Sequence, residues 1–102
     1  MRRLKYLSLG IVLLPSLLYA GQIYGSITSS GKGVANAQIE ITCAGATTNG
    51  ATAGDGSYRI NVPQQGQCKL TLLPSGASAV VFSYPNPSQY DFQLVGNQLR
   101  RR

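Results

Sequence analysis

The sequence has no histidine and no tryptophan, and only Glu40, Asp55 and Asp91 carry acidic side chains. Ser/His/Asp triads, Cys/His pairs and zinc sites built on histidine are therefore excluded. A calcium site needs several carboxylates close together, and Asp55 is the lone acid of its turn. We therefore expect no catalytic residue, no bound metal and no cofactor, and we expect that the protein is not an enzyme.

The lack of tryptophan also argues against a carbohydrate-binding sandwich, because such modules need an exposed aromatic platform. Tyr24 and Tyr84 remain available for one, whereas Tyr58 and Tyr90 alternate in phase with apolar residues and are expected to pack in the core. Calorimetry against oligosaccharides, calcium, zinc and duplex DNA is therefore expected to show no binding.

No long hydrophobic run follows residue 20, so we expect no transmembrane segment in the mature protein. The first 20 residues are typical of an export signal: three positive side chains precede the apolar run Leu7–Leu14, and the small residue Ala20 precedes the expected cut. We expect residues 1–20 to be removed as a signal peptide. Residues 21–102 then form a single exported domain in the periplasm or outside the cell.

The formal net charge of +6 is less informative than it looks, because three of the positive residues belong to the expected signal. After residue 20, the remaining excess of +3 equals the charge of Arg100, Arg101 and Arg102, so the body of the domain is neutral. Nucleic-acid binders spread positive charge over a face or groove, and we expect no nucleic-acid partner. A solvated terminus is favoured over weak attraction of this tail to anionic lipid.

Two cysteines, Cys43 and Cys68, remain in the exported part of the chain. Oxidising compartments favour disulfides, and both cysteines alternate in phase with apolar neighbours, as in Ile41 and Leu70. A redox-active pair would need a Cys-x-x-Cys spacing or a cationic setting, and neither is present. We therefore predict a structural Cys43–Cys68 disulfide on the core side of the strands.

Beyond residue 20 no segment has a helical period, and glycine or proline interrupts the chain every few residues. The fold class is therefore all-β, a small antiparallel β-sandwich. Gly96 and Asn97 are expected to fold the last residues back as a short hairpin. The predicted strands are Gln22–Thr28, Ala37–Cys43, Tyr58–Val62, Cys68–Leu73, Ala79–Tyr84 and Tyr90–Leu94, with Ala44–Ala53 as either an edge strand or an exposed loop.

Four segments in order carry a resemblance to a known family. They are Gly25-Ser-Ile-Thr, the run from Gly31 to Ile41, Gly54-Asp-Gly-Ser-Tyr-Arg-Ile-Asn-Val-Pro, and Cys68-Lys-Leu-Thr-Leu. Together they resemble the carboxypeptidase regulatory-like domain over residues 21–73, with Asn36 standing where the family usually has glycine. The resemblance implies a prealbumin-like, transthyretin-like or immunoglobulin-like sandwich of about seven strands with no catalytic role. The zinc-binding peptidase domain of that family has no counterpart here.

Two function hypotheses follow, and the leading one is a non-catalytic binding or structural module that contacts an unknown protein partner at the cell envelope. Ala44–Ala53 is uncharged and lacks the lysine or proline that usually blocks an exposed strand edge. The candidate pairing residues are Thr47, Thr48, Asn49 and Thr52, and replacing Thr48 by proline is the test that the sequence suggests. A disordered glycine-rich loop is the equally weighted rival.

The alternative hypothesis is a small secreted effector or inhibitor. It would insert the loop Pro85–Gln89 into its partner, with Tyr84, Asn86 and Tyr90 as the contact residues.

Overall fold

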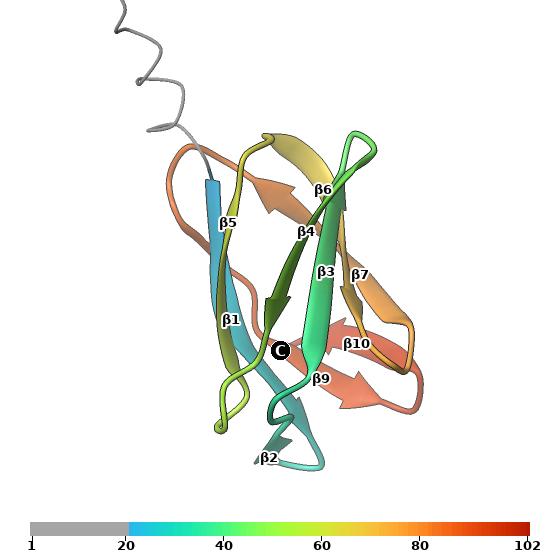
Figure 1. Cartoon of the computed structure of the whole chain (residues 1–102). Helices are drawn as coiled ribbons and strands as arrows, with labels where there is room; N and C mark the ends of the chain where they lie inside the picture. Colours follow the sequence, from blue (N-terminus) through green and yellow to red (C-terminus); the bar gives the residue numbers. More distant parts are fainter. Residues whose placement is uncertain (1–20) are drawn as a thin grey trace, which may run out of the picture.

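The computed structural model describes residues 21–102. In this part of the chain all regular secondary structure consists of β-strands. Polar and apolar residues alternate along these segments, as they do in strands with one buried face. Ten strands form two sheets (Figure 1). They are β1 (Gly21–Ser29), β2 (Lys32–Gly33), β3 (Gln38–Cys43), β4 (Ala46–Ala51), β5 (Ser57–Val62), β6 (Gly66–Leu72), β7 (Ala77–Ser83), β8 (Ser88–Gln89), β9 (Phe92–Val95) and β10 (Gln98–Arg101). The predicted all-β sandwich is confirmed.

The first sheet is built around the long strand β1. Residues 21–26 of β1 pair with β5, and Ile23 and Tyr24 also pair with β8 on the other side. The second half of β1 pairs with β2 and β9, and β10 completes the sheet beside β9. The two halves of β1 therefore pair with different strands, the first half with β5 and β8 and the second half with β2 and β9.

β8 and β9 run parallel to β1, whereas the other pairs in residues 21–102 are antiparallel. The sequence predicts an antiparallel sandwich and gives no sign of this exception. Its cause lies in the crossover after Ser83. The chain leaves β7 in the second sheet, passes through residues 84–87, and enters the first sheet running in the same direction as β1 (Figure 1).

The second sheet has the order β4-β3-β6-β7 and is fully antiparallel. β3 and β4 form a hairpin whose two turn residues, Ala44 and Gly45, have positive φ angles of 49° and 83°. Such two-residue turns match the twist of the flanking strands. Residues 46–51 are thus an edge strand, the first of the two alternatives expected for this segment.

The strand number exceeds the expected seven mainly because of short elements. β2 and β8 have two residues each, and β10 is the hairpin return expected after Gly96 and Asn97. β9 begins at Phe92, two residues later than predicted. The Tyr90 N–H still donates to the Tyr24 carbonyl of β1, but the Ser26 N–H of β1 bonds to the Asp91 carboxylate and not to a backbone carbonyl.

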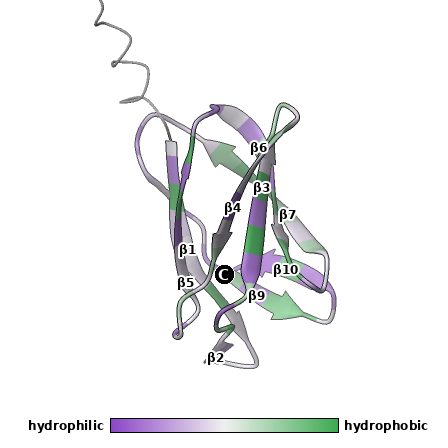
Figure 2. Ribbon diagram, in the orientation of Figure 1, coloured by the Kyte–Doolittle hydropathy of each residue, from purple (hydrophilic) through white to green (hydrophobic). Residues whose placement is uncertain are grey.

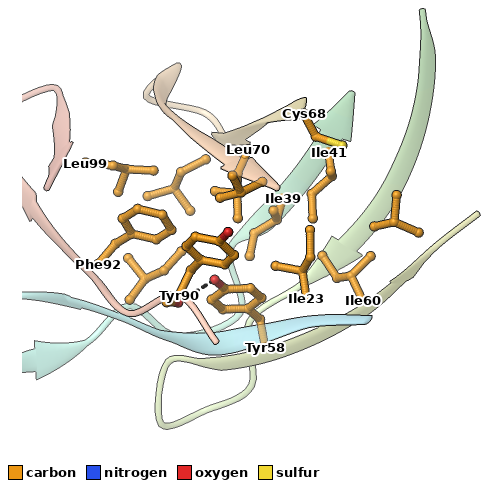
Figure 3. Close-up of a cluster of buried hydrophobic side chains, with 14 of the residues drawn as sticks. Ile23, Ile39, Ile41, Tyr58, Ile60, Cys68, Leu70, Tyr90, Phe92 and Leu99 are labelled. Carbon is orange, nitrogen blue, oxygen red and sulfur yellow. Dashed lines mark hydrogen bonds between the residues drawn. The ribbon is translucent and has the colours of Figure 1, made fainter. Parts of the chain in front are cut away.

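The core lies between the two sheets, where the apolar side chains of each strand meet. Hydrophobic and hydrophilic residues alternate along several strands (Figure 2), and Figure 3 shows the buried side chains converging from both sheets. The buried hydrophobic residues are Ile23, Ile27, Ile39, Ile41, Cys43, Tyr58, Ile60, Val62, Cys68, Leu70, Leu72, Ala77, Val81, Tyr90, Phe92 and Leu99.

The predicted disulfide joins Cys43 and Cys68. The two residues are directly opposite each other in the β3–β6 register, with their Cα atoms 4.4 Å apart. Both side chains are buried, so the prediction that the sulfurs face the core is confirmed.

Candidate functional site

β4 forms one edge of the second sheet, and its pairing decides which backbone groups remain available. Ala37, next to β3, exchanges hydrogen bonds with Thr52, whereas the Gln38 carbonyl accepts from Leu73 on the other side. Because backbone groups alternate sides along a strand, the even-numbered residues of β4 bond to β3. The N–H and C=O groups of Thr47, Asn49 and Ala51 therefore point away from the sheet.

On this outer side, no backbone hydrogen bond joins β4 to another strand within residues 21–102. Thr47 and Asn49 are exposed, and the Thr47 hydroxyl lies 3.1 Å from that of Thr42 on β3. We call Thr47, Asn49 and Ala51 the open edge of β4.

Two of the four residues proposed for pairing lie outside the open edge. Thr48 directs its backbone groups toward Ile41 of β3, its partner in the register. Thr52 is buried, its Oγ1 accepts the Ala37 N–H at 2.8 Å, and its own N–H donates to the Ala37 carbonyl at 2.8 Å. Thr52 therefore stabilises the fold and is not available to a partner.

β7 forms the opposite edge of the second sheet, and a side chain from the first sheet covers part of it. The Phe82 N–H donates to the Tyr90 hydroxyl at 3.0 Å, and this hydroxyl lies 3.4 Å from the Phe82 carbonyl that accepts from it. Tyr90 is buried, although the sequence suggested it as a loop contact residue. The edge of β7 is therefore occupied where that of β4 is open.

Tyr58 holds Tyr90 in this position. Its hydroxyl donates to the Tyr90 carbonyl at 2.6 Å, the bond drawn in Figure 3. Burial raises the pKa of Tyr58, and the negative charge of Asp91 raises it further. Tyr58 thus stays protonated and keeps donating over a wide pH range.

Three exposed apolar side chains lie on the outer face of β7 and directly after it: Val80 and Phe82 on the strand and Tyr84 one residue past its end. We call these three residues the aromatic strip. Their exposed fractions are 54%, 38% and 51%, and the rings of Phe82 and Tyr84 are stacked with centroids 6.2 Å apart. Sequence reasoning identified Tyr84 but missed Val80 and Phe82. The signal was present, since residues 79–84 are apolar on both faces of the predicted strand.

Asn86, the remaining residue proposed for loop contacts, lies in the exposed crossover between β7 and β8. Its carbonyl lies 3.5 Å from the Ser88 hydroxyl, which donates to it. The structure thus keeps Tyr84 and Asn86 exposed and buries Tyr90.

A pocket of about 360 Å³ lies where β4 ends and approaches β5. Arg59 is the one charged side chain among the residues that line it, and its guanidinium carbon lies 5.1 Å from the centre of the Tyr24 ring. The lining residues are Tyr24, Gly25, Ala51, Thr52, Ala53, Ser57, Tyr58 and Arg59.

Two of the C-terminal arginines, Arg101 and Arg102, contact the domain through their side chains. The Arg101 guanidinium lies 4.6 Å from the centre of the Tyr90 ring, and the Arg102 side chain donates to the Ser26 hydroxyl at 3.0 Å. The Arg102 N–H donates to the Asp91 carbonyl at 2.9 Å. These contacts hold the end of the chain against β1, which the charge pattern alone did not indicate.

Within residues 21–102, His, Cys, Asp and Glu side chains form no group of three or more that could hold a metal ion. The same residues include no helix long and apolar enough to cross a membrane.

No family model matches the chain, and no curated protein matches it. Solved structures do match. A DUF3823 family protein from Parabacteroides merdae aligns over 72% of this chain at 13% identity and a TM-score of 0.57. A DUF3823 family protein from Bacteroides ovatus aligns over 72% at 18% identity and a TM-score of 0.59.

A third match is a putative carbohydrate binding protein from Bacteroides uniformis, aligned over 71% of this chain at 20% identity and a TM-score of 0.53. The alignments cover 44%, 43% and 40% of the three neighbours, so this chain corresponds to less than half of each. At these identities the matches establish a shared β-sandwich fold, which is compatible with the carboxypeptidase regulatory-like resemblance.

Proposed function

We propose that residues 21–102 form a non-catalytic module that binds a protein partner by accepting an extended strand at the open edge of β4. The observation that carries this proposal is the row of outward backbone groups at Thr47, Asn49 and Ala51, which no other strand in residues 21–102 uses. Main-chain pairing to a free sheet edge is a general mode of peptide recognition.

The contrast between the two edges of the second sheet supports this choice. β4 has no charged residue and no proline, the devices that usually protect an edge. At β7 the Tyr90 hydroxyl occupies the backbone groups of Phe82. An added strand therefore finds more free hydrogen-bonding groups at β4.

The proposed location is the cell envelope or the outside of the cell. The disulfide is compatible with an oxidising compartment, and the predicted signal peptide supports export, although residues 1–20 lie outside the described part of the chain. The order of the four sequence segments supports distant membership of the carboxypeptidase regulatory-like family. Intact-mass analysis of exported protein should show a chain that begins at Gly21.

Selection of random seven-residue peptides on phage tests the proposal, followed by binding of the selected peptides to the Asn49→Pro variant. Proline at 49 removes an outward donor and leaves the β3–β4 ladder intact, so we expect binding to fall at least tenfold with an unchanged melting temperature. The Thr48→Pro change suggested by the sequence is a poorer test, because it removes a ladder bond to Ile41 and should lower the melting temperature.

Hydrogen exchange supplies the control within the same molecule. The amides of Thr47 and Asn49 should exchange fast in the free protein and become protected by a bound peptide, while the Thr48 amide stays slow in both states. Selected peptides that bind Asn49→Pro as tightly as the wild type, with no new protection in β4, would contradict the proposal.

A second candidate function rests on the aromatic strip. Phe82 stacks on Tyr84 and lies opposite Gln67 of β6, while Val80 lies opposite Lys69, and aromatic rings next to polar side chains suit a sugar ring. One structural neighbour is described as a putative carbohydrate binding protein. Calorimetric binding of an oligosaccharide that is lost in a Phe82→Ser, Tyr84→Ser double variant would favour this function over the sequence-based expectation of no binding.

The secreted effector or inhibitor remains a proposal for the crossover loop. Asn86→Ala together with Tyr84→Ala should abolish partner binding if this loop carries the contact, whereas Asn49→Pro should not affect it. The two variants therefore distinguish the loop from the open edge.

A further inference from the structure

The open edge of β4 has a defined end. The Thr52 N–H donates to the Ala37 carbonyl and the Ala53 N–H donates to the Ser57 carbonyl, both at 2.8 Å, so the fold itself uses these groups. A strand that pairs with Thr47 and Asn49 can therefore continue no further than Ala51. Beyond that point it must end or leave the sheet.

The pocket described above lies at this end of the edge. Ala51, Thr52 and Ala53 contribute to its lining, together with Tyr24 and Arg59 from the first sheet. Its volume of about 360 Å³ falls in the usual range for small-ligand pockets, roughly 300–1,000 Å³. The residue of an added strand that lies at its end beside Ala51 would thus be placed at this pocket.

Arg59 is held in a fixed orientation in the pocket. Its guanidinium stacks on the Tyr24 ring, and its Nη1 donates to Gln22 Oε1 at 2.7 Å. Gln22 in turn donates through Nε2 to Asn61 Oδ1 at 3.1 Å. The other donors of the guanidinium make no hydrogen bond within residues 21–102, and a guanidinium fork matches the geometry of a carboxylate.

Asp55 and Asp91 both have other partners than Arg59. The Asp55 carboxylate accepts from the N–H and hydroxyl of Ser57, and the Asp91 carboxylate accepts from Ser26 and Gln89. Arg59 is also exposed, so an incoming group can reach its side chain. The positive charge at the end of the open edge is therefore free to pair with an incoming anion.

We propose that the strand accepted by β4 carries a carboxylate at its end beside Ala51, and that Arg59 binds this carboxylate in the pocket. The inference rests on the proposed function, because it places the anion on a strand paired with β4. An acidic side chain reaches the pocket whichever way the strand runs. A C-terminal carboxylate reaches it only when the strand runs parallel to β4.

The test uses random seven-residue peptides displayed on phage in two formats, one with a free C-terminus and one with the C-terminus fused to the coat protein. Binders are selected on the wild-type protein, and the strongest are synthesised as free acids and as amides. A side-chain source predicts enrichment of Asp or Glu in both formats. A terminal source predicts binders only in the free format, with affinity lost on amidation.

In either case the Arg59→Gln variant should bind the carboxylate-bearing peptides about tenfold more weakly, since a charge-assisted hydrogen bond pair is lost. Arg59→Lys should recover part of this loss, and the effect should shrink in 1 M salt. Lys69→Gln, which removes a positive charge from the other sheet, is the matched control and should leave binding unchanged.

The outcomes separate this inference from the function on which it rests. Peptides that need the open edge but show no carboxylate preference, and that bind Arg59→Gln normally, would overturn the inference alone. Peptides insensitive to Asn49→Pro, or the absence of any binder, would overturn both.

Discussion

Tyr90 joins the two sheets with a single side chain. Its ring lies in the core beside Phe92, with ring centroids 6.4 Å apart, while its hydroxyl bonds to both backbone groups of Phe82 on β7. A tyrosine is suited to this position because it combines a large apolar body with a polar end that can be satisfied. The residue therefore covers the β7 edge at Phe82, whose backbone groups would otherwise be free.

The donor to the Tyr90 carbonyl, Tyr58, gives a first prediction. Burial raises the pKa of its hydroxyl above the usual value of 10.0, so above that pH the unfolded chain loses a proton that the folded chain keeps. The stabilisation is fully present below pH 10 and falls as pH rises through the folded-state pKa. The free energy of unfolding, from urea titrations at pH 8, 10 and 11, should therefore decline less steeply in Tyr58→Phe than in the wild type. Parallel curves for the two proteins would contradict this.

Ala44 gives a second prediction at the same scale. Its φ of 49° is a conformation that side chains with a Cβ adopt at a cost, here in the first position of the β3–β4 turn. Ala44→Gly should therefore raise the free energy of unfolding by about 0.5–1 kcal/mol. Ala46→Gly, at the first residue of β4, is the control and should lower the free energy of unfolding. Equal losses in both variants would show that the turn conformation is not the cause.

At the scale of elements, β1 depends on a close approach by the segment that joins β8 to β9. The Tyr90 N–H donates to the Tyr24 carbonyl, and the Asp91 carboxylate accepts the Ser26 N–H, so this segment follows β1 across Gly25. A Cβ atom at Gly25 would lie 1.9 Å from the Tyr90 carbonyl oxygen. Only glycine fits between them.

The third prediction concerns this contact. Gly25→Ala should reduce the free energy of unfolding by more than about 2 kcal/mol, because backbone atoms on both sides have to move. Gly54→Ala is the matched control, since a Cβ atom there meets no atom within 4 Å. Denaturant titrations of the two variants check the difference, and a tolerant Gly25→Ala would mean that β8 and β9 can separate from β1 at little cost.

At the scale of the whole molecule, the disulfide is a large part of the stability of a domain this small. Cys43 and Cys68 are separated by 25 residues, and the loop they close should contribute about 3–4 kcal/mol in the chain-entropy model. The fourth prediction is that reduction, or the Cys43→Ala, Cys68→Ala double change, lowers the free energy of unfolding by this amount. An unchanged denaturation midpoint in the presence of reductant would contradict it.

Local sequence patterns were sufficient to determine the fold class, most strand positions and the disulfide. The two-residue alternation in segments such as Ile39–Cys43 depends only on which face of a strand is buried. Because this alternation is a local property, it also predicted that both cysteines face the core, without knowledge of which strands pair.

Only the tertiary structure decided which surfaces are free. The sequence suggested Thr48, Thr52 and Tyr90 as partner contacts, but pairing with β3 uses the Thr48 backbone. Thr52 and Tyr90 are buried, and their hydroxyls bond to the backbone of Ala37 and Phe82. The open edge of β4 and the orientation of the Arg59 guanidinium on Tyr24 and Gln22 also depend on partners distant in sequence. Burial and pairing are properties of two strands at once, so no single segment of the chain could reveal them.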